Sequence, residues 1–507
     1  MITSGDVASE QAGPKPRTGG DIPEAQRCPH QRVTVPGTNR PLPGFPVNTV
    51  PERRRRPVSP NIPVADGMPL IANLWPMYNN LPRFLVEQYR KHGPVFRVRA
   101  LNKRYVVLAG PDASSFVGSA LGRASLHSRP SWIKLVGEYG ADKAVVSDDG
   151  ELHAQLREMM RRGYSRQSLD GRYMRIVDVI DAWLDEHWPP GTELQAVAQL
   201  QELIVNEISI AIADEILFED IDHIRTQVHW ATNVHLLGRW PRVMLRLPKY
   251  QRSLNTLMTD AQRITAAFKE RAHSPAAQGS NARLFDDLIQ ANKAHPDLMN
   301  DHELPVNIYA PFLAGMDTAS NTVAALLYLL LAHPDSHRAV LAESDELFAP
   351  NTVIDHQLLL HATPYLNAFI KEAMRMYPTV PILMRHALTD FEFAGYRIPK
   401  GEPVMVATVV PQLSAEFFSD PFNFDPTRFL DSENRSHQLP GVYSPWGRGP
   451  HTCLGKRIAE ILMPLTVARI VHRRHYRLAD AHYVLEDRYS YGVDLALNLQ
   501  LYAASSR

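Results

Sequence analysis

The sequence is poor in cysteine: Cys28 and Cys453 are the only two among 507 residues. A disulfide framework needs several cysteines, so a disulfide-stabilised secreted domain is excluded and we expect a reducing compartment. No cysteine and histidine residues have the spacing of a structural zinc site. Cys28 lies in a polar, proline-rich segment, which leaves Cys453 as the cysteine with a candidate role.

An excess of charge of one sign is also lacking. Lys plus Arg and Asp plus Glu both number 54, so the net charge is zero. This balance argues against nucleic-acid binding and against an acidic tail. No apolar run of signal-peptide or anchor length occurs near the N-terminus, so we expect a cytoplasmic protein without a transmembrane anchor.

Proline is abundant, with 40 residues, and many lie in the first 60 positions. We expect residues 1–60 to be a disordered Pro/Arg-rich N-terminal extension and residues 61–507 to be one domain. Within the extension, Arg53 to Arg56 form a basic block. A solvated linker is the favoured interpretation, and contact with anionic lipid headgroups is the alternative.

The hydrophobic pattern predicts a mostly α fold with a small β region (α+β). Leu81–His92 has helical periodicity, and Val95–Arg99 and Tyr105–Leu108 alternate as strands do. Residues 148–332 are mostly helical in pattern, strand-like runs occupy residues 391–406, and a last helix is expected over residues 454–475.

The longest apolar tract is Leu304–Ala332. Asn307 and Asp317 lie within it, and polar groups of this kind are costly in lipid. A helix that is apolar on most sides is otherwise a buried core helix, which is the interpretation we favour. Pro311 removes a backbone N–H here, so we expect a kink or a shifted helix start.

One cysteine lies in a glycine-rich stretch, Pro445 to Gly455, directly before an apolar helical segment. Glycine allows close approach of the backbone to a flat ligand. A cysteine just before a helix has its thiolate stabilised by free N–H groups and by the helix dipole. The stretch therefore predicts an anionic sulfur presented to a large planar group.

This stretch resembles the haem-binding loop of the cytochrome P450 family. Gly449, His451, Cys453 and Gly455 match the family pattern in register. Trp446 stands where phenylalanine is usual, and His451 where arginine is commonest. The resemblance implies heme b (iron protoporphyrin IX) between a long central helix and the loop, with Cys453 as the metal ligand. The alternative is a buried structural cysteine.

The central helix carries Ala314, Gly315, Asp317 and Thr318. Small residues leave room for a diatomic ligand, and a threonine can bond to the carbonyl one turn earlier. An acid beside that hydroxyl provides a route for protons. The segment resembles the family's oxygen-activation motif, which implies a catalytic role for these residues. The alternative is a glycine-kinked helix with a polar residue turned to a neighbour.

Glu372 and Arg375 lie three apart in a predicted helix and share a face. Arg428 lies in a segment resembling the family's Pro-x-Arg-Phe. By resemblance the three form a buried structural triad that holds the cysteine loop. The alternative for the first two is a surface ion pair that contributes little.

Haem carries two carboxylates, the propionates, which need cationic or donor partners. His153 and Arg157 lie four apart in a helical stretch that resembles a haem contact of bacterial family members. The resemblance implies that Arg385 and His451 also meet a propionate. Each of the four alone has the alternative of a surface cation.

The resemblance implies a monooxygenase that inserts one atom of O2 into a lipophilic small molecule: a steroid, terpenoid, fatty acid or secondary metabolite. Electrons would come from a separate ferredoxin and ferredoxin reductase, and the protein would be a monomer. Residues 229–252 are expected to be an amphipathic lid, with peripheral membrane contact as the alternative. The predicted docking face for the redox partner is basic and comprises Arg161, Arg162, Arg448, Lys456 and Arg457.

Two other functions remain open. One is a non-oxygenating haem-thiolate enzyme, an isomerase or a peroxygenase, which would usually lack the pair of Asp317 and Thr318. The other is a non-enzymatic haem sensor, which would not need a proton route.

Overall fold

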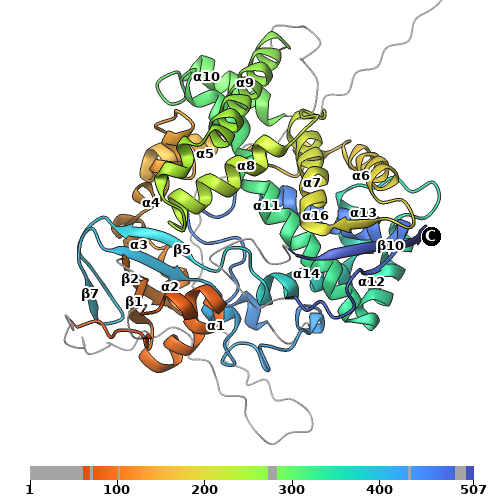
Figure 1. Ribbon diagram of the computed structural model, residues 1–507. Coiled ribbons are helices and arrows are strands. Elements are labelled where there is room, and N and C mark those ends of the chain that lie inside the picture. The colour runs from red at the N-terminus through yellow and green to blue at the C-terminus, as the bar shows by residue number, and fades with distance from the viewer. Residues whose placement is uncertain are drawn as a thin grey trace, which may run out of the picture. The chain divides into compact units, whose positions relative to one another are not determined.

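The computed structural model describes residues 61–68, 72–100, 103–271, 283–431, 435–485 and 498–506 (Figure 1). The predicted extension, residues 1–60, lies outside these ranges, so its state and its boundary stay predictions.

Helices dominate the described residues, as the hydrophobic pattern predicted. The α-helices are α1 (Leu74–His92), α2 (Pro111–Phe116), α3 (Ala120–Ser125), α4 (Arg129–Glu138), α5 (Gly150–Met160), α6 (Tyr173–His187), α7 (Ala196–Ala213), α8 (Asp222–Ala231), α9 (Pro248–Arg271), α10 (Leu284–Ala294), α11 (Glu303–Ala332), α12 (Pro334–Leu347), α13 (His356–Ala362), α14 (Pro364–Met376), α15 (Val409–Gln412) and α16 (Lys456–Arg473). Shorter helical turns are η1 (Gln167–Leu169), η2 (Thr232–Leu236), η3 (Arg242–Arg246), η5 (Pro426–Phe429) and η6 (Ser436–Gln438).

The β structure is small, and its largest sheet lies apart from most of the helices, at the lower left in Figure 1. The strands are β1 (Val95–Ala100), β2 (Lys103–Ala109), β3 (Leu126–His127), β4 (Glu193–Gln195), β5 (Leu383–Ala387), β6 (Phe391–Phe393), β7 (Tyr396–Ile398), β8 (Pro403–Ala407), β9 (Arg474–Leu478) and β10 (Gln500–Ser506). The largest sheet has the order β1-β2-β8-β5-β3, and β2 and β8 are its parallel pair. The fold class is therefore α+β, as predicted.

Helix α11 runs through the middle of the helical part (Figure 1). Its residues Leu304, Phe312, Met316 and Leu326 are fully buried, so the longest apolar tract is a core helix, as the polar residues within it indicated. The helix begins well before Pro311 and continues through it. The alternative of a shifted start is therefore wrong.

One helix among the described residues, α7, is long and apolar enough to cross a membrane by length and composition. It packs against α11 and α6, and 72% of the apolar stretch is buried inside the protein. Burial of this kind is typical of a core helix.

Candidate functional site

The cysteine loop is a closed turn at the N-terminus of α16. The Cys453 N–H donates to the Trp446 carbonyl over 2.9 Å, and the Thr452 N–H donates to the Gly449 carbonyl over 3.0 Å. Trp446 packs against the main hydrophobic core. Cys453 thus ends a turn that is anchored by an aromatic side chain, and α16 begins at Lys456.

The sulfur of Cys453 lies in an environment with opposing influences. The residue is accessible to solvent, yet the protein surrounds its sulfur closely enough that desolvation raises the pKa of the thiol. Backbone N–H groups of Gly455 and Lys456, together with the Arg157 charge, act in the opposite direction. The loop therefore offers donors to an anionic sulfur, and a cation bound to that sulfur would complete the stabilisation.

Gly449 is required by the packing of the loop on the protein itself. Its φ of 74° is left-handed, and a Cβ there would lie 2.9 Å from the Val117 carbonyl oxygen and 3.0 Å from the Gly118 Cα. The glycine therefore allows the loop to approach the end of α2. A Cβ at Gly455 would meet only ordinary contacts, 4.0 Å from the Cys453 sulfur.

Three of the four predicted propionate contacts line one cavity of about 320 Å³. They come from α5 (His153), β5 (Arg385) and the cysteine loop (His451). Segments more than two hundred residues apart in sequence thus bring their cationic or donor groups to one place. We call these three residues the cation cluster.

Two members of the cation cluster have unfilled hydrogen-bonding capacity. The buried Nε2 of His153 has no partner among the described residues, and desolvation lowers the pKa of this imidazole to about 4. Arg385 is 6% exposed and donates to the Met384 carbonyl over 2.7 Å. It makes no ion pair within the described ranges, and desolvation lowers its pKa to about 10. Buried donors of this kind fit an anionic ligand.

His451 is already engaged on one side. Its Nε2 lies 3.0 Å from Asp149 Oδ1 and 3.1 Å from Ser128 Oγ, and its ring is 4.2 Å from that of His153. Desolvation opposes the charge on Asp149, but hydrogen bonds from His451 and Ser128 outweigh it and lower the pKa of the carboxyl. Only the Nδ1 side of His451 remains for a propionate.

Asp149 was not predicted as part of the site. An aspartate directly before a helix is normally taken as its N-cap, but its side chain makes no capping bond to α5. It accepts instead from the Ser128 N–H over 2.7 Å. The position of Asp149 in the sequence indicates a helix cap, whereas in the fold its carboxylate bonds to His451 and orients that ring.

Arg157 lies on α5 but does not line the cavity. It is partly buried, its pKa is lowered by desolvation, and its charge interacts with that of Cys453. The structure therefore brings Arg157 close to the sulfur, on the same helix as His153.

The predicted oxygen-activation segment lies in the middle of α11. Ala314 is exposed although Phe312 and Met316 are fully buried, and a Cβ at Gly315 would lie 2.8 Å from Ile208 Cδ1. The Thr318 hydroxyl donates to the Ala314 carbonyl over 2.8 Å, the bond that the sequence predicted. Ala314 and Thr318 thus form an accessible, hydroxyl-bearing face of α11, whereas Gly315 lies against Ile208 of α7.

Asp317 accepts a hydrogen bond from Gln201 of α7, with Nε2 2.7 Å from Oδ1. Gln201 was not predicted from the sequence, because nothing in the periodicity of α7 indicates which of its residues faces α11.

The structure brings the predicted triad together. Both nitrogens of the Arg375 fork bond the two oxygens of Glu372 over 2.7 Å, and Arg428 Nε lies 3.3 Å from Glu372 Oε1. Arg375 also donates to the carbonyl of Gln412, whose side chain accepts from the Ser444 N–H over 2.9 Å. The triad thereby connects to the chain entering the cysteine loop.

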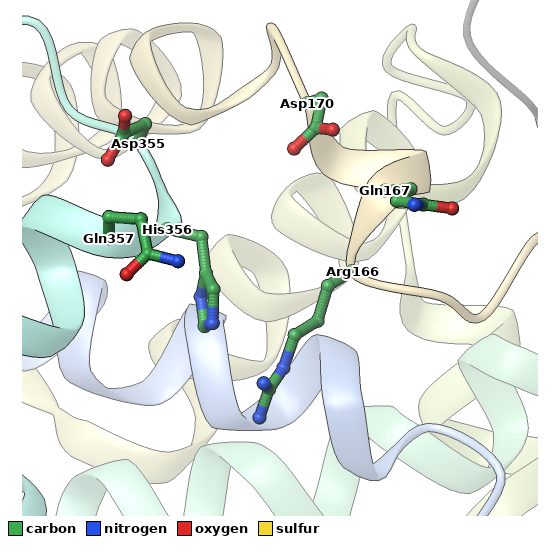
Figure 2. Close-up of a pocket in the computed structure, with 6 residues that line it drawn as sticks. All are labelled: Arg166, Gln167, Asp170, Asp355, His356 and Gln357. Carbon is green, nitrogen blue, oxygen red and sulfur yellow. The ribbon is translucent and has the colours of Figure 1, made fainter.

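A second hollow, of about 250 Å³, contains no predicted site residue (Figure 2). Asp170 and Asp355 lie on opposite sides of it, and the Asp355 carboxylate points away from Asp170 and caps α13, while Arg166 and His356 point towards α16. Arg166 pairs with Glu460 of α16 over 3.3 Å. A cation and an anion compensate one another here, whereas Arg385 of the cation cluster makes no ion pair within the described ranges.

The residues present fit a haem. The Cys453 sulfur, which has N–H donors beside it, can bind the haem iron. The two haem carboxylates can bind the His153 nitrogen and the Arg385 guanidinium, because both groups can still donate to an acceptor.

Comparison with known proteins agrees with this fit. The cytochrome P450 family model matches residues 62–482. Taxane 10-beta-hydroxylase of Taxus cuspidata is 27% identical over 419 residues, covering 80% of this chain and 82% of that protein. Putative cytochrome P450 136 of Mycobacterium tuberculosis is 24% identical and covers 84% of each chain.

Solved structures share the fold. Retinoic acid bound cyanobacterial CYP120A1 superposes with a TM-score of 0.71 at 21% identity and covers 89% of this chain and all of that one. The cytochrome P450DA heme domain gives a TM-score of 0.74 at 19% identity, covering 89% and 99%. The chain therefore belongs to the cytochrome P450 family: it is a haem-dependent monooxygenase with an external redox partner and a lipophilic substrate.

Proposed function

We propose that this monooxygenase holds heme b through Cys453 and hydroxylates a lipophilic molecule with an isoprenoid skeleton. The observation that carries the haem assignment is the cation cluster beside the cysteine loop, in which a buried imidazole nitrogen has no hydrogen-bond partner and a buried guanidinium makes no ion pair among the described residues. The isoprenoid class is supported by relatives named for taxane and abscisic acid hydroxylation and by a neighbour bound to retinoic acid.

The cofactor, when bound, supplies an iron that activates O2. Cys453 would hold that iron as a thiolate, to which the N–H groups of Gly455 and Lys456 donate. His153, Arg385 and the Nδ1 side of His451 would bind the propionates, and Arg157 would add positive charge near the sulfur.

Proton supply is assigned to Asp317 and Thr318. The Thr318 hydroxyl hydrogen is directed at the Ala314 carbonyl, so its oxygen keeps lone pairs that accept a bond from water. Asp317 is adjacent and can carry a proton between solvent and this site. Ala314, which is exposed, would leave the space that a small ligand needs beside the helix, and Gly315 lets Ile208 of α7 approach that helix.

Electrons are proposed to come from ferredoxin and its reductase. The predicted basic docking face is partly neutralised, because Arg161 pairs with Glu158 and Arg162 with Asp287. Arg457 is exposed, and Lys456 lies 3.6 Å from Glu460. Charge reversal at Lys456 and Arg457 should slow reduction by ferredoxin, and an unchanged rate would remove this face from the proposal.

We further propose a monomer in the cytoplasm that contacts membrane surfaces peripherally. Trp75 and Tyr78 of α1 are 55% and 49% exposed, and Val243 of η3 is 60% exposed. Arg239 stacks over Tyr78 at 5.8 Å, so basic and apolar groups adjoin as membrane-surface binding requires. In a flotation assay with vesicles containing anionic lipid, the wild type should float with the vesicles. A variant with Trp75→Ser and Val243→Ser should stay in the unbound fraction.

The carbon-monoxide difference spectrum of the reduced protein tests the central proposal. A strongly red-shifted Soret band is expected, and Cys453→Ser should abolish it. Haem uptake with an unshifted band in the wild type would contradict the Cys453 assignment. Titration with retinoic acid and abscisic acid, followed by the spin-state shift, then tests the substrate class.

A further inference from the structure

The carboxylate of Asp317 accepts a hydrogen bond from a residue of another helix, Gln201, and the orientation of the Gln201 amide can be assigned from its second partner. Gln201 of α7 donates through Nε2 to Asp317 Oδ1 over 2.7 Å. At its other end, Gln201 Oε1 accepts from Arg225 Nε of α8 over 2.9 Å. A guanidinium can only donate, so Arg225 fixes which end of the amide is the acceptor. The NH2 end must therefore face Asp317.

Arg225 is itself held in place by two further acceptors. Its Nη1 donates to Asp222 Oδ1 over 2.7 Å, and its Nη2 donates to the Ala198 carbonyl over 2.5 Å. The side chains of Arg225 and Asp222 are 29% and 75% exposed. A continuous series of hydrogen bonds thus joins Asp317 in the core helix to the solvent-facing side of α8.

We infer that Gln201, oriented by Arg225, is the positioning residue for Asp317 and sets the rate at which that carboxylate passes protons inward. The inference rests on the proposed role of Asp317 in proton supply. One proton reaches the carboxylate from solvent, and one leaves it towards the site; no electrons are exchanged. The amide fixes one carboxylate oxygen without cancelling its charge, which keeps Asp317 both oriented and able to accept a proton.

Oxygen reduction without added substrate measures this role directly. With a surrogate ferredoxin and reductase, release of peroxide consumes one NADPH per O2, and full reduction to water consumes two. Water formation needs more protons at the site, so impaired delivery should raise the peroxide share. The stoichiometry of NADPH to O2 is therefore the readout, together with the solvent isotope effect.

Gln201→Leu removes the donor and keeps a similar volume. We expect proton delivery to slow roughly tenfold, with a higher peroxide share and a changed solvent isotope effect. Gln201→Glu keeps the bond to Arg225 but places an acceptor opposite Asp317. Its defect should be largest at alkaline pH and should recover at acidic pH, where the introduced carboxyl group is protonated and can donate again.

Glu202→Gln is the matched control, because Glu202 lies on the same helix and pairs with His187 over 3.4 Å. It should behave as wild type. A wild-type stoichiometry and isotope effect in Gln201→Leu would overturn the inference, as would equal changes in Gln201→Leu and Glu202→Gln. A wild type without the red-shifted carbon-monoxide band would instead overturn the proposed function, independently of Gln201.

Discussion

Two regions of this protein, the triad and the cation cluster, each contain a buried arginine, and the two arginines differ in how completely they are paired. In the triad, Arg375 is fully buried and bonds both oxygens of Glu372 and two carbonyls. In the cation cluster, Arg385 is nearly as buried but bonds one backbone carbonyl and no carboxylate of the described residues. A complete set of partners indicates a role in holding the fold, and an incomplete set indicates a place kept for a ligand.

The largest effect is expected from Arg375→Leu. The change leaves Glu372 buried with only Arg428 as its cation, and it orphans the carbonyls of Gln412 and Pro421. We expect a loss of about 5 kcal/mol or more of the free energy of unfolding. The midpoint of urea unfolding measures it. A midpoint close to that of the wild type would remove the triad from its structural role.

A third buried ionisable group, Glu207 of α7, extends the comparison because both its oxygens share a single hydroxyl. Each lies 2.9 Å from Thr466 Oγ1, and burial raises its pKa to about 8. Between about pH 4.5 and 8 the carboxyl group is protonated in the folded state and ionised in the unfolded chain. The free energy of unfolding should therefore fall as the pH rises across that window.

Glu207→Gln should remove this slope and stabilise the protein above pH 8 by about 3–5 kcal/mol. Urea unfolding at several pH values from about 5 to 9 measures it. Parallel curves for the two proteins would show that Glu207 ionises normally in the folded state.

Arg385→Met should act in the direction opposite to Arg375→Leu. In the haem-free protein it removes a buried charge that makes no ion pair within the described ranges and is offset only by the Asp149 charge, so the free energy of unfolding should not fall. Haem affinity should fall about 10- to 100-fold with the loss of a charge-assisted bond. Titration of the apoprotein with haemin gives the affinity. A destabilised apoprotein with unchanged haem affinity would reverse our assignment of the cation cluster.

The smallest effect is expected from Arg161→Leu, which is the matched control for Arg375→Leu. Arg161 and Glu158 have the same residue types and the same spacing as the pair in the triad, but their side chains are 74% and 66% exposed. We expect a change below about 0.5 kcal/mol. If the two variants lost similar stability, burial would not be the cause of the difference.

Local patterns in the sequence predicted the features that depend on nearby residues. The alternation at Val95–Arg99 predicted β1, and the apolar tract with interior polar residues predicted a buried α11. The spacing of Glu372 and Arg375 predicted a shared helix face. Each of these features depends on residues that lie close together in the sequence, within one helix or one strand.

Features formed between distant segments could not be predicted in this way. Asp149 looks like a helix cap and instead orients His451, which lies 302 residues away in the sequence. Gln201 gains its partner only because α7 packs on α11. Even the need for glycine at position 449 comes from the end of α2. Such contacts depend on tertiary packing, for which a single sequence gives no direct signal.

The parallel pairing of β2 with β8 bears on how the chain is made in the cell. Val106 pairs with Val404, so roughly 300 residues must leave the ribosome before β2 can find this neighbour. At about 5–20 residues per second the wait is about 15–60 s. During this wait the apolar edge of β2 has no β8 to pair with. The nascent chain is therefore a candidate for chaperone binding, and the yield of folded protein should depend on the speed of translation.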